Sequence, residues 1–454
     1  MPSPSRIVFP VLIVAALLIR LANTLWLALS GFDMLDADAV VYWSAAGQFL
    51  EHGAFLDGSL SALPLTERMP GYILFLAALR FIFGAEFWPV LLAQAVIDTA
   101  SVVVSGLIVR RFGRACMLTA MALAGLSINQ ISQAGMILTD SLFLFCLLLS
   151  LWGAERATAT GGWRWILLAG FAIGMATLVR PASLPLIACM AAGAGLTIFL
   201  RNRSWLQSTS AAFMMLCASI AVILPWQIRN HALFDSWSLT TQSGTHLQNW
   251  VVAEIKATAD GTTRAEAAAQ LQQQSAAEMA LIAADNPFQL SAAQVAMAKR
   301  QLSEQPLGAI VQTYLRGAAL FLAAPSILFD PRVRALPKPS FDGTTGPLPQ
   351  RVGRMLSQSD PRYVALAGIG TLVHLGYMAL AGWGLIILCR RHPWAGMTAI
   401  LWVLYFLLLT GPVSGAKYRL PAEAVLTPCA AIALQWLWLR ANQRLIALFS
   451  KNQR

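Results

Sequence analysis

The sequence is poor in charged residues. Asp, Glu, Lys and Arg make up 12% of its 454 residues, about half of the roughly 25% found in soluble domains. Hydrophobic residues make up 57%, and the mean hydropathy is +0.63. Apolar runs of about 20 residues recur along the chain and are long enough to cross a bilayer as helices. The composition excludes a soluble globular chain and predicts an all-α polytopic membrane protein.

Patterns for metal or redox chemistry are also absent. The six cysteines lie within apolar runs and form no C-x-x-C pair, so neither a disulfide framework nor a zinc site is expected. The five histidines include no H-x-x-x-H pair, and there is no Gly-rich phosphate loop. We therefore expect no cofactor, although acidic side chains could hold a divalent cation.

Positive charge, +11 overall, gathers at the ends of apolar runs. The clusters Arg110–Arg114, Arg201–Arg203, Arg390–Arg391 and Arg440–Arg454 are typical of cytoplasmic loops. The charge therefore predicts membrane topology and a lipid bilayer as partner, with no nucleic acid. The first run, Ile7–Leu29, is long for a signal peptide, and we expect an uncleaved anchor in a bacterial inner membrane.

Placing the basic clusters inside divides the chain into three parts. Residues 1–229 form an N-terminal transmembrane catalytic module with a first external loop at 30–70. Residues 230–362 form an external or interfacial region, and residues 363–454 form the C-terminal transmembrane helices. The chain is expected to hold roughly ten to twelve membrane helices. Residues 262–304 are rich in Ala, Gln and Glu and predict one or two helices in a small external subdomain.

Two acids, Asp36 and Asp38, follow the first apolar run. A carboxylate at the membrane surface can act as a general base or help to hold a divalent cation, and it can also be a solvated loop residue. Asp38 and Tyr42 have the i, i+4 spacing that places two side chains on one face of a helix. Asp38 is therefore the first candidate for the base, with Asp36 as the alternative.

Arg68 precedes Pro70-Gly71 and Tyr72. The Pro-Gly pair breaks the approach to the next apolar segment and would hold the guanidinium at headgroup level. There it can bind phosphate oxygens or serve as an interfacial anchor.

Two further acids lie in apolar segments. Asp140 follows Thr139 at the expected outer end of a helix, where an ionisable group indicates function and either residue could also cap the helix. Asp98 lies deeper, and for it we expect only pairing with a neighbouring helix.

Three basic motifs fall at expected outer ends, against the usual bias of positive charge to the inside. They are Arg180-Pro181, Trp226–Asn230 with Arg229, and Lys417–Pro421 with Tyr418 and Arg419. Any one of these cations is commonly a snorkelling anchor. Together they predict an anionic ligand in the outer leaflet.

The collinear series of motifs resembles the GT-C-fold glycosyltransferases, in particular the protein O-mannosyltransferases and lipid A aminoarabinose transferases. The motifs are Asp38–Tyr42, Arg68–Tyr72, Arg111–Arg114, Leu138–Asp140, Arg180-Pro181, Pro225–Asn230 and Tyr418–Pro421. The resemblance covers residues from about 7 to 440. It implies a GT-C-like bundle, a polyprenyl-phosphate-linked sugar as donor, and a lipid, glycan or protein acceptor on the external face.

The resemblance also implies roles for individual residues. Asp38 takes the role of base and Asp140 that of the assisting acid, with Asp36 as a possible substitute because Ala39 stands where the family often has Glu. The donor phosphate would be bound by basic residues, namely Arg68, Arg229, Arg180, Lys417 and Arg419, and the substrate would be lined by Tyr42, Tyr72 and Tyr418. The position of Arg419 after the tyrosine departs from the family pattern.

The main alternative is a transporter or a lipid-linked-sugar flippase, which would also carry outer cations and buried acids. It predicts acids near the midplane and broken helices in paired halves. Asp98 fits that picture, whereas Asp38 and Asp140 at the membrane edge fit an enzyme. A non-catalytic assembly protein would leave the motif series unexplained.

Overall fold

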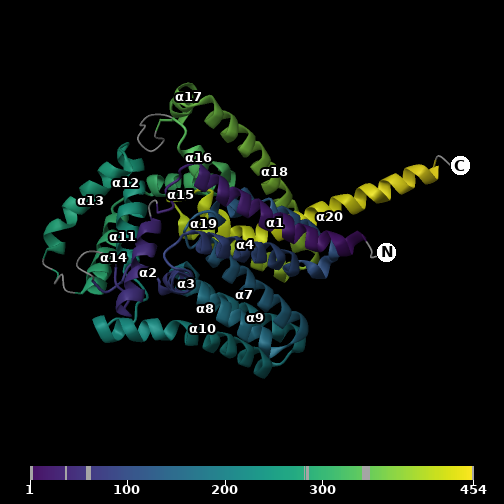
Figure 1. Cartoon of the computed structure of the whole chain (residues 1–454), viewed down its shortest axis with the longest axis horizontal. Helices are drawn as coiled ribbons and strands as arrows, with labels where there is room; N and C mark the ends of the chain where they lie inside the picture. Colours follow the sequence, from purple (N-terminus) through teal and green to yellow (C-terminus); the bar gives the residue numbers. More distant parts are fainter. Residues whose placement is uncertain are drawn as a thin grey trace.

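The computed structural model describes residues 4–35, 38–57, 63–280, 282, 286–339 and 348–451. The chain is 83% helical and has no strand among these residues, apart from an isolated antiparallel bridge between Leu56 and Pro64. Figure 1 shows long helices gathered in one bundle, with shorter helices at the end that lies away from both termini. The expected all-α polytopic membrane fold is confirmed.

Eight helices in the described residues are long and apolar enough to cross a membrane. They are α1 (Pro4–Leu29), α4 (Trp88–Ile108), α7 (Asp140–Thr160), α9 (Leu184–Asn202), α10 (Trp205–Phe234), α18 (Pro361–Arg391), α19 (Pro393–Thr410) and α20 (Leu420–Lys451). A pair of helices, α5 (Arg114–Gly125) and α6 (Ile128–Ala134), is bent by 54° and forms either a broken ninth span or a re-entrant loop. The 17-residue α8 (Trp163–Val179) has the minimum length for a span. If both α8 and the bent pair are counted as spans, the total is ten, the lower limit of the expected ten to twelve membrane helices.

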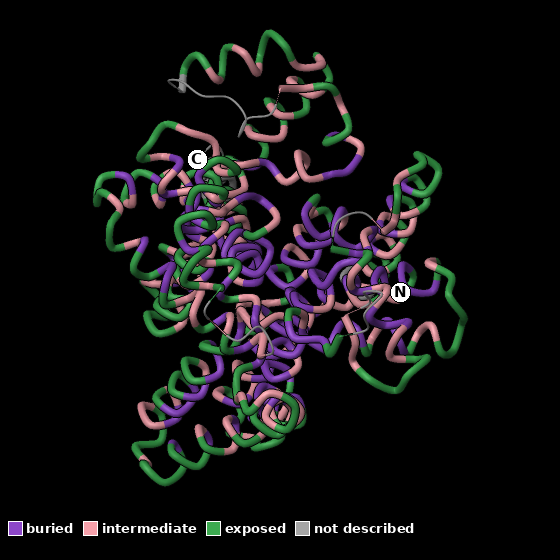
Figure 2. The backbone as a smooth tube through the Cα atoms, turned by 90° about the vertical axis from the view of Figure 1, so that its left-hand side faces the viewer, coloured by how far each residue is buried: buried purple, intermediate pink, exposed green. Residues whose placement is uncertain are grey.

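Serine side chains join the helices of the N-terminal half. Ser150 of α7 donates to the carbonyl of Ala169 on α8 at 2.8 Å. Ser219 of α10 donates to Gly170 on α8 at 2.9 Å. Small polar residues of this kind let membrane helices approach closely and form hydrogen bonds to each other. Figure 2 shows the result, with buried residues concentrated in the middle of the bundle and exposed ones at its periphery.

A buried ion pair ties the first helix to the bundle. The Arg20 Nε of α1 lies 2.5 Å from Asp98 Oδ2 of α4, and neither side chain is exposed. Arg20 also donates to the carbonyls of Ala124 and Gly125 on α5. The expectation that Asp98 pairs with a neighbouring helix is confirmed.

The remaining helices are mostly shorter, and α11 to α14 gather on the left of Figure 1, away from both termini. The remaining helices include α2 (Asp38–His52), α3 (Pro70–Phe83), α11 (Gln242–His246), η3 (Leu247–Val252), α12 (Ala253–Asp260), α13 (Arg264–Met279), α14 (Pro287–Ser303), α15 (Leu307–Ala323), α16 (Pro331–Arg334) and α17 (Leu348–Gln358). Of the one or two helices expected within residues 262–304, the structure has two, α13 and α14. Thr263 and Glu266 form a capping box at the start of α13, and Asn286 caps α14. These caps satisfy backbone N–H groups at the start of each helix.

Candidate functional site

The first part of the candidate site is an ion pair between α2 and the loop that precedes α3. Asp38 is the first residue of α2, and Arg68 lies two residues before α3. Arg68 Nη2 donates to Asp38 Oδ1 at 2.8 Å. The carboxylate is 53% exposed and the guanidinium 17%, so the acid is open to a ligand while the cation is fixed. Asp36 lies outside the described residues.

Two tyrosines lie beneath this pair. Tyr42, one turn after Asp38, packs edge-on against Tyr72 with 5.3 Å between ring centroids, and the Arg68 guanidinium lies 5.7 Å from the Tyr42 ring centroid. Burial raises the pKa of Tyr42, so its phenol stays neutral. The Tyr72 hydroxyl donates to Gln94 Oε1 at 2.6 Å. Because Tyr72 is fully buried, it supports Tyr42 instead of lining an open surface.

The second part of the site is a buried acid that holds two cations. Asp140 begins α7, and its side chain is 1% exposed. Its Oδ2 accepts from Arg180 Nη2 at 2.6 Å and lies 3.8 Å from Lys417 Nζ in the turn η5 (Lys417–Arg419). Burial disfavours the charged guanidinium of Arg180, yet the Asp140 carboxylate, together with Tyr42 and Tyr418, outweighs this and raises the pKa of Arg180.

Thr139 has a different role from the helix cap considered above. It occupies the N-cap position of α7, but its side chain makes no cap hydrogen bond. Its hydroxyl accepts from Arg180 Nε at 2.6 Å. Thr139 and Asp140 therefore bind two nitrogens of the Arg180 guanidinium, and together they fix the orientation of its plane.

The two parts meet at the aromatic side chains. Tyr42 is within electrostatic range of Arg68, Arg180, Asp38 and Asp140. Tyr418, which is 38% exposed, is within range of Arg180 and of the same two acids. Segments that are far apart in the sequence therefore place two acids, three cations and two phenols in one cluster.

Arg229, another expected phosphate ligand, contacts the loop backbone. Its Nη1 donates to the carbonyl of Leu65 at 2.7 Å, and its Nη2 donates to that of Phe55 at 3.2 Å. Two neighbouring side chains act in the same way, since Trp226 donates to Leu239 and Asn230 to Ser238. The motif Trp226–Asn230 fixes the loop between α2 and α3 and the segment after α10.

Arg419 is also directed away from the cluster. Its side chain is fully buried, with Nη1 donating to the carbonyls of Phe321 and Ala324 and Nη2 to Ser326 Oγ. It holds the end of α15. Of the three residues Lys417, Tyr418 and Arg419, the first two reach the cluster.

Sequence reasoning missed two residues that lie next to the cluster. Gln94 anchors Tyr72 and donates to the carbonyl of Met136 at 2.7 Å; a polar residue in the apolar run of α4 was the available signal. Arg264 of α13 lies within electrostatic range of Tyr418 and 4.0 Å from the Trp250 ring. Nothing in the external region of the sequence pointed to it.

The acids of the cluster are already engaged by cations. Among the described residues, no group of three or more His, Cys, Asp or Glu side chains is placed to hold a metal ion. Asp38 and Asp140 are each bonded to an arginine. The divalent cation considered for Asp36 and Asp38 stays a prediction.

The comparisons with known proteins agree with the motif series. Residues 67–228, less than half of the chain, match the family described as dolichyl-phosphate-mannose-protein mannosyltransferase. No curated protein matches the sequence.

Solved structures show the fold. The Archaeoglobus fulgidus oligosaccharyltransferase in its apo form is 12% identical, with a TM-score of 0.54 over 98% of this chain and 52% of that chain. Its complex with Zn and sulfate is 13% identical, with a TM-score of 0.54 over 96% of this chain and 51% of that one. This chain thus spans about half the length of the archaeal enzyme. ArnT from Cupriavidus metallidurans is 16% identical and covers 94% of this chain and 76% of its own, with a TM-score of 0.37. The expected resemblance to the GT-C-fold glycosyltransferases is confirmed.

Proposed function

We propose that this chain is a membrane glycosyltransferase. It moves a sugar from a polyprenyl-phosphate carrier to a lipid, glycan or protein acceptor at the external face of a bacterial inner membrane. The observation that carries the proposal is the convergence of two acid–arginine pairs, Asp38 with Arg68 and Asp140 with Arg180. The family match over residues 67–228 supports the same class of reaction.

Asp38 acts as the general base. It accepts the proton of an acceptor hydroxyl or amine while that group attacks C1 of the sugar. The bond from C1 to the acceptor forms as the bond from C1 to the phosphate oxygen breaks, and polyprenyl phosphate leaves with the electron pair. The half-exposed Asp38 carboxylate can meet an incoming acceptor, which the buried Asp140 cannot.

The cations of the cluster bind the donor phosphate. Arg68, Arg180 and Lys417 are each partly exposed, at 17%, 24% and 22% of their side chains. Guanidinium groups bind phosphate oxygens in pairs of charge-assisted hydrogen bonds. They stabilise the negative charge that grows on the phosphate as it departs.

Asp140 is a positioning residue. It is too buried to reach substrate, and its carboxylate is already shared between Arg180 and Lys417. By holding both cations, it preorganises them for the phosphate. Arg229 is a positioning residue as well, because it fixes the loop that carries Arg68.

No observation favours the transporter or flippase. Its supporting feature in the sequence was Asp98, an acid inside an apolar helix. That acid is paired with Arg20 and fully buried between helices, so it needs no transported ligand to explain it.

The test is transfer of radiolabel from a polyprenyl-phosphate-linked sugar to a cell-envelope fraction by the purified chain in liposomes. Asp38→Asn keeps the shape of the side chain and removes the base. We expect a loss of about 100- to 10,000-fold. Movement of the labelled donor across the bilayer without transfer would instead establish a flippase.

Asp235→Asn is the matched control. Asp235 is 92% exposed and has a φ of 53°, a backbone conformation that asparagine tolerates well. The Asp235→Asn variant should transfer the labelled sugar at the wild-type rate. Full activity of Asp38→Asn together with an inactive Asp36→Asn would assign the base to Asp36.

A further inference from the structure

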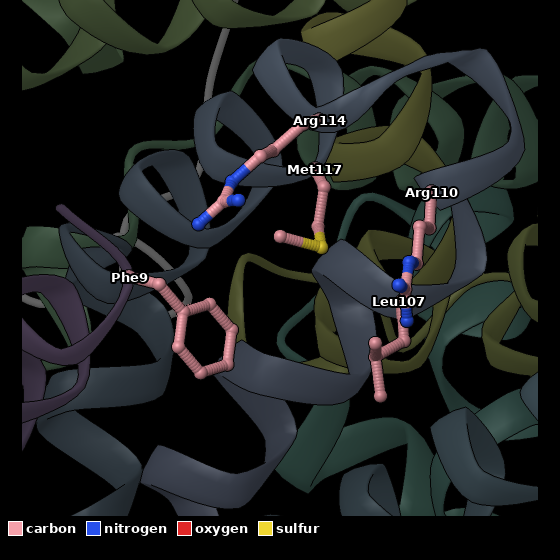
Figure 3. A pocket seen from close by; sticks show the side chains of 5 residues that line it. All are labelled: Phe9, Leu107, Arg110, Arg114 and Met117. Atoms are coloured by element: carbon pink, nitrogen blue, oxygen red, sulfur yellow. The ribbon is translucent and has the colours of Figure 1, made fainter. Parts of the chain in front are cut away.

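A cavity of about 340 Å³ lies where α1, α4 and α5 meet. Figure 3 shows its lining, with Arg110 and Arg114 on opposite sides of the Met117 side chain. Phe9 and Leu107 complete the lining. Two cations therefore flank a cavity whose other walls are apolar.

A second cavity, of about 520 Å³, adjoins the first and shares Leu107 and Arg110 with it. Two more arginines, Arg111 and Arg156, line it together with Trp152 and Trp165. Among the residues that line the two cavities, four arginines stand against a single acid, Glu155. The pair of cavities is strongly positive.

The cavities lie at the other end of the bundle from the candidate site. α7 begins at Asp140 and carries Trp152, Glu155 and Arg156 near its end. Sixteen residues of helix separate Asp140 from Arg156, a rise of about 24 Å. A ligand in the cavities therefore cannot be the substrate phosphate held by Arg180.

Cations next to apolar walls suit one class of ligand. A guanidinium binds phosphate oxygens, and side chains such as Phe9 and Met117 suit an acyl chain. Tryptophans are enriched at the depth of lipid headgroups, and Trp152 packs edge-on against Trp165 at 5.1 Å. A neutral lipid would not need the cations, and a soluble anion would not need the apolar walls.

We propose that the two adjoining cavities bind an anionic phospholipid, with Arg110 and Arg114 on its phosphate and Leu107 between the cavities. Basic pockets between membrane helices bind such headgroups in other proteins. The positive-inside rule explains why arginines gather at this end, but it does not explain why they line cavities with an apolar wall.

The experiment measures lipid binding to the purified full-length chain by native mass spectrometry, with dioleoylphosphatidylglycerol and dioleoylphosphatidylcholine as probes. The wild type should bind the anionic phosphatidylglycerol more tightly than the phosphatidylcholine. Arg110→Ala and Arg114→Ala should each weaken that binding by about fivefold. Leu107→Trp should weaken it as well, since Leu107 lines both cavities and the larger side chain narrows them while every cation stays.

Arg390→Ala is the matched control. Arg390 is an exposed cation at the end of α18 that lines neither cavity, and its loss should change binding less than twofold. If Leu107→Trp does not fold, Arg110→Lys replaces it, because a lysine keeps the charge and loses the fork, and should bind at an intermediate level. Equal binding of the two lipids, or equal losses in Arg390→Ala and Arg110→Ala, would overturn the proposal. The assay does not depend on glycosyl transfer.

Discussion

Gly71 of α3 lies directly against the backbone carbonyl of Leu178 near the end of α8; a Cβ atom at Gly71 would come within 2.7 Å of that oxygen. Arg68 stands three residues before Gly71, and Arg180 two residues after Leu178. This contact brings the segments that carry the two arginines together, so that both lie within electrostatic range of Tyr42.

Gly71→Val should therefore disturb the site through its framework. The branched side chain cannot fit, and separation of α3 from α8 should lower stability by about 1–3 kcal/mol and reduce glycosyl transfer. Thermal unfolding and the transfer assay report the two effects. Gly193→Ala is the control, because a Cβ at Gly193 meets nothing within 4 Å. A Gly71→Val protein with wild-type stability would contradict the contact.

Asp140→Asn should destabilise the protein more than Asp38→Asn does. It leaves Arg180 and Lys417 without their shared carboxylate, and removal of one partner of a buried ion pair costs about 3 kcal/mol or more. Thermal unfolding measures the difference. The double variant Asp140→Asn/Arg180→Gln should lose less stability than the sum of the single variants. Strict additivity would show that the two side chains act independently.

Arg68 and Arg229 should differ in a titration of the donor. Arg68→Ala should raise the donor concentration needed for half-maximal rate, and Arg68→Lys should restore it in part, because lysine lacks the bidentate fork. Arg229→Ala should instead lower thermal stability, since the carbonyl of Leu65 loses this donor and that of Phe55 keeps only the backbone N–H of Leu65. Complete rescue by Arg68→Lys would make Arg68 an interfacial anchor.

Cysteine labelling tests the predicted topology. In a background with the exposed Cys189 and Cys217 replaced by serine, Asp260→Cys should react with an impermeant reagent added outside intact cells. Ala115→Cys, exposed beside the arginine cluster that follows α4, should react after permeabilisation only. The reverse pattern would place the candidate site in the cytoplasm.

The sequence predicted the membrane class and the cluster residues because composition, charge at helix ends and motif order carry that information locally. It named Asp38, Arg68, Asp140 and Arg180. It did not predict which acid pairs with which arginine, because these contacts depend on helix packing between segments 30 to 40 residues apart.

Arg229 and Arg419 show where motif reasoning fails. Both are cations at predicted outer ends, and both donate to backbone carbonyls of other segments. A sequence shows which side chain can donate, but not which carbonyl oxygens the fold leaves without a partner. Those carbonyls, at Leu65 and Phe321, carry no residue-type signal.

The pairing of acids and cations has a consequence for turnover in the proposed reaction. The cluster has two carboxylates, two guanidinium groups and one ammonium group. Its net charge is therefore about +1, a positive excess of one unit that matches the single negative charge of a phosphodiester donor. The phosphate monoester left after transfer carries about 1.5 to 2 negative charges at neutral pH. By then Asp38 has taken up the proton of the acceptor, so the positive excess has also risen to about two units. Exit of the spent carrier would thus depend on loss of that proton from Asp38, which restores the single excess charge.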